Sequence, residues 1–392
     1  MNIFAKHGWK FINKLSGCNS QRIGQTAGVV GKKVKWNSPA ASSYCSFEIR
    51  EEQIRSMASG MVFYRSKVHL VYSKYHDEIF PIDELDISEL FYKSTSAAKA
   101  AAVAASKKDG KDGRGYKVRE LPSLGVTALK PSFIFKPFRS GYYDVVKAKG
   151  VPVFAPFGDG EDGPMILCAD GMGHTVVHDT SLEGSTMGMP MMNAPKGLFH
   201  AAISGWRWRP LPPPPFRREP KYECDPYVAM AVDGNTIFIS PSTERRIGTY
   251  AFDTVTQEWE KAGEWQLPFV GKAEYVPELK HWFGISRRNP YNLCAVDALG
   301  PPWRRHELAD LDMPEGAGLS DHCLLYLGSG RFCTVRFFVE DERSEYCKPH
   351  DVPVFTGVEV VRCDDQAEGP GIKMIKHKSM FLEDDHEMRS VI

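Results

Sequence analysis

The stretch Gly248–Phe269 constrains the fold more than any other part of the chain. It reads GTYAFDTVTQEWEKAGEWQLPF. Aromatic and small residues alternate up to Asp253, a polar loop follows, and Trp259 heads the residues beyond it. Alternation with a period of two that ends in a polar turn is typical of a strand entering a hairpin. We therefore expect two antiparallel strands here, with Asp253 and Thr254 capping the hairpin rather than contacting a ligand.

The same pattern recurs along the chain. Three aspartates, Asp179, Asp253 and Asp297, each end a β-rich run. Trp259 and Trp303 lie six residues after the second and the third, and 44 residues separate Asp253 from Asp297. That spacing is typical of one four-stranded blade of a β-propeller, in which blades stack radially around a channel. The sequence therefore predicts an all-β fold, a propeller of about six blades.

The bulk composition agrees with many short strands and argues against several classes of protein. Gly (34) and Pro (27) are frequent among the 392 residues, which favours turns over long helices. The net charge is zero, so nucleic acid is not an expected partner. Nine cysteines without a C-x-x-C pair are typical of reduced thiols in an intracellular protein. No apolar run reaches the roughly 18 residues of a membrane span.

Charge divides the chain into segments. Residues 1–47 carry seven Lys or Arg and no acid, with apolar residues at helical spacing. This segment resembles an organelle transit peptide; the alternatives are a disordered basic tail or an N-terminus foreign to the domain. The β-propeller domain is expected over residues 48–382, and residues 383–392 form an acidic tail. The predicted location is cytoplasmic or nuclear, or mitochondrion or plastid if residues 1–47 direct import.

A low-complexity insertion interrupts the domain at residues 93–116. Its alanine run, Ser94–Ser106, is compatible with a short helix. The following Lys107–Arg114 alternates Lys, Asp and Gly, which predicts a mobile surface loop. A basic loop could instead contact phosphate, but a solvated insertion is the favoured interpretation.

Two turn-forming stretches could each have a binding function instead of a purely structural one. The proline-rich Arg209–Pro215 must adopt a polyproline II or edge-like conformation. R-P-L-P-P-P-P matches the peptides that SH3-like domains bind, although we favour a connector between blades. Gly171 and Gly173 follow a strand, but another β-run comes next, so we expect a hairpin turn rather than a phosphate-binding loop.

No catalytic, cofactor-binding or metal-binding residue is predicted. Three sequence pairs could supply a base and its orienting acid, namely His178–Asp179, Asp321–His322 and His350–Asp351. No Ser or Cys sits in a recognisable nucleophile turn beside them.

The cysteines and the dipeptide His377-Lys378 are likewise expected to have structural roles. Cys323 and Cys333, with His322 and His350, fit no zinc-binding spacing, so buried strand thiols are expected. The dipeptide His377-Lys378 is expected to end the closing strand.

Seven segments carry a resemblance to a known family. They are WRWRPLPPPPF (Trp206–Phe216), GNTIFIS (Gly234–Ser240), GTYAFD (Gly248–Asp253), WEKAGEWQLPFVGKAEYVPE (Trp259–Glu278), HWFGIS (His281–Ser286), LGSGRFCTV (Leu327–Val335) and HKS (His377–Ser379). They are similar to the grass-expanded plant family catalogued as domain of unknown function 1668, a set of kelch-like β-propellers. The resemblance covers residues 150–382 well and 50–150 loosely. It implies a plant source and a kelch-like propeller, and no known activity or site residues.

The chain departs from the family pattern at one point. The family has a further strand pair before the WRWRPLPPPPF connector, whereas here Phe199–Ser204 runs through Gly205 straight into Trp206. One blade near Gly205 is therefore expected to be incomplete.

These observations predict a non-enzymatic protein-interaction scaffold that uses no cofactor and binds a protein partner still to be identified. Propellers hold loops on a rigid frame, and such loops carry binding. The alternative is an enzyme or small-ligand binder that uses the channel mouth, where polar groups would converge in one pocket.

Overall fold

The computed structural model describes part of the chain. The described residues are 65–73, 79–109, 117–124, 131–137, 152–157, 165–170, 173–180, 185–189, 191, 211–218, 228–241, 247–308, 314, 318–340, 350–365, 369–383 and 387–392. The predictions for residues 1–47 and for Gly205 lie outside them, as does most of the predicted surface loop at Lys107–Arg114.

The described chain is all-β with one α-helix, as the sequence predicts. The first sheet has the order β21-β1-β2-β4, and another has the order β5-β6-β7-β8. Their bounds are β1 Lys67–Ser73, β2 Phe80–Asp86, β4 Phe133–Phe135, β5 Val153–Phe157, β6 Met165–Ala169, β7 Thr175–Asp179, β8 Thr186–Met189 and β21 Glu387–Val391.

An eight-stranded sheet consists of two four-stranded meanders, β9 to β12 and β13 to β16. The two join through a short parallel pairing of β13 with β9, in which Lys272 faces Met230 and Ala273 faces Ala231. The strands are β9 Ala229–Asp233, β10 Thr236–Ser240, β11 Thr249–Asp253, β12 Glu258–Gly263, β13 Phe269–Val276, β14 His281–Ser286, β15 Leu293–Val296 and β16 Arg305–Glu307.

The longest strands form a five-stranded sheet with the order β17-β18-β19-β20-β3. They are β17 Gly318–Gly328, β18 Arg331–Glu340, β19 His350–Asp365, β20 Gly369–Leu382 and β3 Ser123–Leu124. The helix α2, Thr95–Asp109, and the short 3-10 helices η1 Ser88–Leu90, η2 Val118–Glu120 and η3 Pro215–Arg218 complete the described elements.

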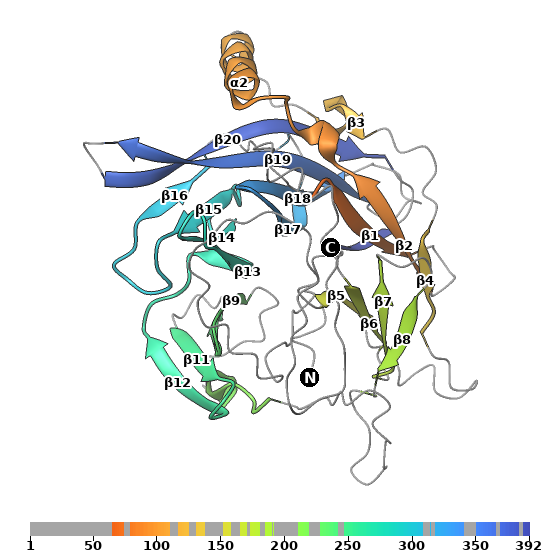
Figure 1. Ribbon diagram of the computed structural model, residues 1–392, viewed down its shortest axis with the longest axis vertical. Helices are drawn as coiled ribbons and strands as arrows, with labels where there is room; N and C mark the ends of the chain where they lie inside the picture. The colour runs from red at the N-terminus through yellow and green to blue at the C-terminus, as the bar shows by residue number, and fades with distance from the viewer. Residues whose placement is uncertain are drawn as a thin grey trace, which may run out of the picture.

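The meanders follow one another in chain order around a common centre (Figure 1). In each, the first strand lies nearest that centre: β5, β9, β13 and β17 are innermost, and β8, β12, β16 and β20 are farther out. The part of the chain that the structure describes thus contains five four-stranded antiparallel units. The kelch-like propeller and its blade count stay predictions.

The organising hairpin forms as predicted. Phe252 of β11 pairs with Trp259 of β12, and Asp253 pairs with Glu258. The carboxylate of Asp253 accepts hydrogen bonds from the backbone N–H groups of Val255 and Thr256, at 2.7 and 3.0 Å. This aspartate therefore fixes the turn by satisfying its own backbone, which is why aspartate favours such positions.

Neighbouring sheets are held together by separate apolar clusters. One joins the first sheet to the β17–β20 sheet and includes Leu70, Leu85, Val335 and Phe355. A second joins β13–β15 to β18–β20 around Phe283. A third joins the first sheet to β5–β8. Because apolar residues of these sheets are buried against neighbouring sheets, no sheet is expected to be stable alone.

The closing strand of this arrangement is β21. It pairs antiparallel with β1, so Leu70 faces Val391. Ile392 then exchanges two backbone hydrogen bonds with His69, both 2.8 Å, and its side chain is only 4% exposed. The segment predicted as an acidic tail therefore contributes residues 387–391 to the first sheet, because Val391 and Ile392 have apolar clusters to enter.

Helix α2 confirms the expectation for the alanine run. It lies outside β20 (Figure 1) and packs against that strand. Ala98 is buried, whereas Val103 is 57% exposed. Isolated helices of this length are marginal in water, so α2 depends on how its first turn is anchored.

Replacing Ile392 by Ala should destabilise the protein by about 2–4 kcal/mol, because the change empties a buried site between the first sheet and β5–β8. Denaturant unfolding followed by circular dichroism measures the loss. Val103→Ala removes two methyl groups from an exposed position and should change stability by less than about 0.5 kcal/mol. Equal effects of the two substitutions would contradict the buried position of Ile392.

Candidate functional site

Two loops at one end of the eight-stranded sheet are tied together. They are residues 264–268, between β12 and β13, and residues 287–292, between β14 and β15, here called the paired loops. The backbone N–H of Arg287 donates to the carbonyl of Pro268 at 3.0 Å. The Arg287 guanidinium donates to the Gln266 side-chain oxygen at 2.7 Å. The two loops are therefore linked by a backbone and a side-chain hydrogen bond.

The first of the paired loops is fastened to β10 and β11. The Ser240 hydroxyl, which is fully buried, accepts the Leu267 N–H at 2.9 Å. The Thr249 hydroxyl donates to the Trp265 carbonyl at 2.7 Å, and the Gln266 amide donates to the Pro241 carbonyl at 3.0 Å. Where the strand pairing ends, buried side-chain hydroxyls thus provide hydrogen-bond partners for the backbone groups of the loop.

The second loop is organised around Ser286. Its hydroxyl accepts the Arg288 N–H at 3.1 Å and a guanidinium N–H of Arg305 at 2.8 Å. The backbone N–H of Tyr291 donates to the Arg288 carbonyl at 2.7 Å, and Tyr291 has a φ of 60°. A left-handed tyrosine is uncommon and is kept only where its surroundings impose it. The Tyr291 ring stacks on His322, with the ring centroids 5.7 Å apart.

The paired loops present aromatic and arginine side chains. Arg288 is exposed, and Trp265 and Tyr291 are half-buried. The Trp265 ring meets Trp303 edge-on at 5.8 Å between centroids, which restricts its rotation. Trp, Tyr and Arg are the residues most enriched at the energetic centres of protein interfaces. The arrangement is suited to binding a protein surface.

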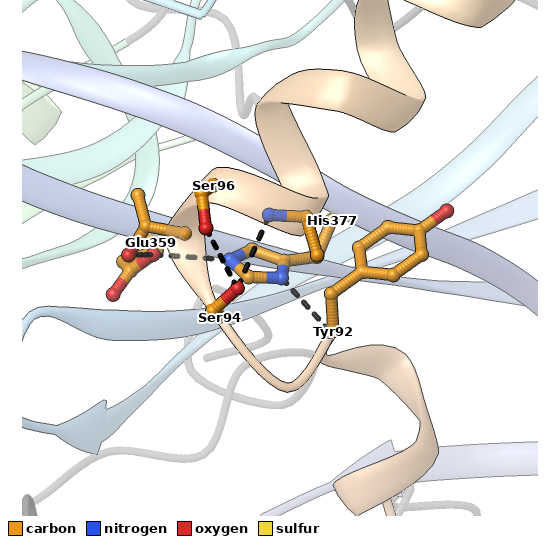
Figure 2. A network of polar contacts seen from close by, with 7 residues as sticks. Tyr92, Ser94, Ser96, Glu359 and His377 are labelled. Carbon is orange, nitrogen blue, oxygen red and sulfur yellow. Dashed lines mark hydrogen bonds and ion pairs between the residues drawn. The ribbon is translucent and has the colours of Figure 1, made fainter.

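A second polar network anchors α2 and is shown in Figure 2. The His377 ring in β20 lies between the Tyr92 backbone and the Glu359 carboxylate in β19. The backbone N–H of Tyr92 donates to Nδ1 of His377 at 3.0 Å. The hydroxyl of Thr95, in the first turn of α2, donates to Oε2 of Glu359 at 2.9 Å. The N-terminus of α2 further favours the negative charge of Glu359.

The hydrogen bonds of His377 define its tautomer. A backbone N–H can only donate, so Nδ1 carries a lone pair and the proton of the neutral ring sits on Nε2, 3.3 Å from Oε2 of Glu359. Burial lowers the pKa of His377, while the hydrogen bond and the charge of Glu359 oppose that shift. The side chain is fully buried. This histidine is therefore a structural clamp, with no nitrogen that a substrate could reach.

Four of the described thiols are unreactive. Burial raises the pKa of Cys168 and Cys333 to about 12 and that of Cys294 to about 11. Burial also raises the pKa of Cys323 well above its ordinary value. Because the thiolate is the nucleophile, these four cysteines are inert at neutral pH. Cys323 and Cys333 lie in β17 and β18, as the prediction of strand thiols expects.

The His174 ring is oriented by a buried carboxylate. Asp170, at the end of β6, has a buried carboxylate that accepts the His174 backbone N–H at 2.9 Å and lies 3.1 Å from Nδ1 of the same residue. Since a carboxylate only accepts, Nδ1 carries the proton and the lone pair of the neutral ring is on Nε2. The His174 side chain is 33% exposed. The sequence reading missed this pair because the residues are four apart, across a turn.

The three predicted His–Asp pairs lie in β7, β17 and β19. The ring of His178 stacks on Phe133 at 4.4 Å, and Asp321 accepts the backbone N–H of His322. His350 and Asp351 lie side by side in β19, where their backbones pair with β18. Within the described ranges, no three His, Cys, Asp or Glu side chains could hold a metal ion. Among the described helices, none is long and apolar enough to cross a membrane.

A comparison with protein families finds a match to part of the chain. A family model described as "Protein of unknown function (DUF1668)" matches residues 198–382. This stretch includes the paired loops, β9 to β20 and the proline-rich connector, and it supports a relationship to that family of unknown function. A comparison with curated proteins finds no match.

The stability of the protein should fall as the pH is lowered from 6.5 to about 4. Burial, with Arg65 nearby, lowers the pKa of His69 to about 4. The pKa of a histidine in an unfolded chain is about 6.5. Between pH 6.5 and about 4, His69 is therefore protonated in the unfolded chain and neutral in the folded chain, which favours unfolding. His69 alone accounts for on the order of 3 kcal/mol. Denaturant unfolding between pH 4.5 and 7.5 measures the slope, which His69→Gln should reduce; an unchanged slope would exclude His69 as its source.

Replacing His377 by Ala should loosen α2. The Tyr92 N–H and the Glu359 carboxylate would each lose a partner, at a cost of about 1–3 kcal/mol. Hydrogen exchange followed by mass spectrometry should show faster exchange in residues 92–104, with little change in β13–β15. Ser96→Ala is the matched control, because Ser96 is exposed and its hydroxyl lies 2.9 Å from the exposed Ser94 hydroxyl. Unchanged exchange of α2 in His377→Ala would show that the network does not anchor it.

Proposed function

We propose that the protein is a non-enzymatic interaction scaffold built on a kelch-like β-propeller, and that the paired loops are part of its binding face. The observation that carries this proposal is the rigid presentation of Trp265, Arg288 and Tyr291 by loops that are hydrogen-bonded to each other and to the sheet. Preorganised side chains of these types lose little conformational entropy when a partner binds.

The propeller part of the proposal is supported by the order of the meanders. They succeed one another around a common centre with their first strands innermost, and β21 pairs with β1 from the other end of the described chain (Figure 1). Radial stacking of four-stranded units is the architecture that leaves few exposed edges. A plant source and an intracellular location belong to the same proposal, and they rest on the resemblance in sequence and on the scattered cysteines.

Substituting Arg288 and Tyr291 together by Ala should remove partner capture. Loss of one interface anchor costs about 2 kcal/mol, or roughly thirtyfold in affinity. Wild-type and variant proteins serve as baits in a plant extract, and quantitative mass spectrometry compares the captured proteins. Val255→Ala with Thr256→Ala, in the turn at the opposite end of the sheet, is the control and should capture as wild type does. Equal capture by all three baits would contradict the assignment of the face.

An enzyme or a small-ligand binder is the second candidate, and the Asp170–His174 pair favours it. A buried carboxylate behind a half-exposed imidazole is the arrangement that positions a general base or a ligand-binding nitrogen. A thermal-shift screen of polar metabolites on wild type and His174→Ala tests this candidate. A compound that stabilises wild type only would support it, and no stabilising compound would remove its basis.

A further inference from the structure

The proline-rich connector is seated on its own sheet. The indole N–H of Trp259 donates to the Pro212 carbonyl at 2.9 Å. Phe216, in η3, is 2% exposed and its ring lies 5.4 Å from that of Tyr250. Leu211 packs against the same apolar cluster, which is formed by β9 to β12. These contacts fix the position of the proline-rich segment on the sheet, and this is compatible with its predicted role as a connector.

The connector buries some of its side chains and exposes others. Leu211 and Pro212 are half-buried and Pro214 and Phe216 are buried, whereas Pro213 and Pro215 are exposed. Polyproline II has three residues per turn, so residues three apart share a face. Consecutive prolines enforce this conformation, since the ring fixes φ and the residue before each proline is kept extended.

The seat has the chemistry that recognises polyproline II. Proline has no N–H, so a proline-rich strand offers carbonyl oxygens and ring faces only. Proteins that bind such strands use aromatic grooves with a hydrogen-bond donor to a carbonyl. Trp259 supplies both, because its ring packs on Phe252 at 4.9 Å while its N–H points at Pro212.

We infer that the surface around Trp259 and Tyr250, here called the groove, is a polyproline-binding site, occupied here by Leu211–Pro214, which a proline-rich peptide of a partner protein can also enter. The peptide it fits has an apolar residue followed three positions later by proline, as Leu211 and Pro214 are. The inference deepens the proposed scaffold function by naming a partner class for a second surface. Polyproline II has no internal hydrogen bonds, so the connector is held by the groove contacts themselves.

Competition with the connector determines the affinity for a partner. The tethered segment is present at a high effective concentration, so the wild-type groove is free for only a small fraction of the time. The apparent affinity of an added peptide is reduced by that fraction. Weakening the connector should therefore strengthen peptide binding, which is the reverse of what a purely structural contact predicts.

The test uses a fluorescent peptide that copies residues 209–217, RPLPPPPFR, and fluorescence anisotropy with the full chain. Leu211→Ala should bind the peptide about tenfold more tightly than wild type. Pro213→Ala, at an exposed position of the same segment, should bind as wild type does. Adding Trp259→Phe to Leu211→Ala should abolish the gain, and a peptide with Ala at the positions of Pro212 and Pro214 should not bind.

The inference would be overturned if Leu211→Ala bound the peptide no more tightly than Pro213→Ala. It would also be overturned if the tighter binding of Leu211→Ala persisted when Trp259→Phe was added. Circular dichroism verifies that each variant folds, and Phe216→Leu replaces Leu211→Ala if that variant does not. The peptide assay does not involve Arg288 or Tyr291. Failure of peptide binding with normal partner capture therefore refutes this site alone, whereas the reverse result refutes the binding face of the paired loops alone.

Discussion

The pairing of β21 with β1 is the interaction on which the rest of the structure depends. It joins the two ends of the described chain, and it places Val391 and Ile392 in the clusters that hold the first sheet against its two neighbours. Without it, β1 would present an open edge, and both neighbouring sheets would lose buried apolar area. Strands that are close together in the sequence can pair early in folding. The pairing of β21 with β1 joins residues far apart in the sequence, so it is expected to form late.

Polar groups serve two purposes in this framework. Inside it, charged or ionisable groups are committed to structure: the His377 ring bridges the Tyr92 backbone and the Glu359 carboxylate, and the four buried thiols stay protonated. At one end of the eight-stranded sheet, Ser240, Thr249 and Ser286 hold loops that carry the exposed Arg288 and the half-buried Trp265 and Tyr291. Binding residues on loops fixed by a rigid frame is the common division of labour in β-proteins.

Local features of the fold could be predicted from the sequence, and distant contacts could not. The hairpin at Asp253, the alanine helix and the strands of β9 to β20 follow from alternation and turn residues close together in the chain. The clamp at His377 was missed because Tyr92 lies 285 residues away. Strand β21 was missed because it follows acidic residues around Glu383, and its sequence, EMRSV, has no apolar alternation. The paired loops were missed because their hydrogen bonds connect Gln266 with Arg287, which no periodicity indicates.

The closed arrangement is tested most directly by native-state hydrogen exchange in the full chain and in a chain that ends at residue 386. In the truncated chain the backbone amides of β1 that face β21 should exchange as unprotected amides, and protection should fall in β5–β7 and β18 as well, because both flank the first sheet. Protection in β13–β15 should persist longest. Unchanged protection of β1 after removal of residues 387–392 would contradict a structure whose first sheet is completed by its last strand.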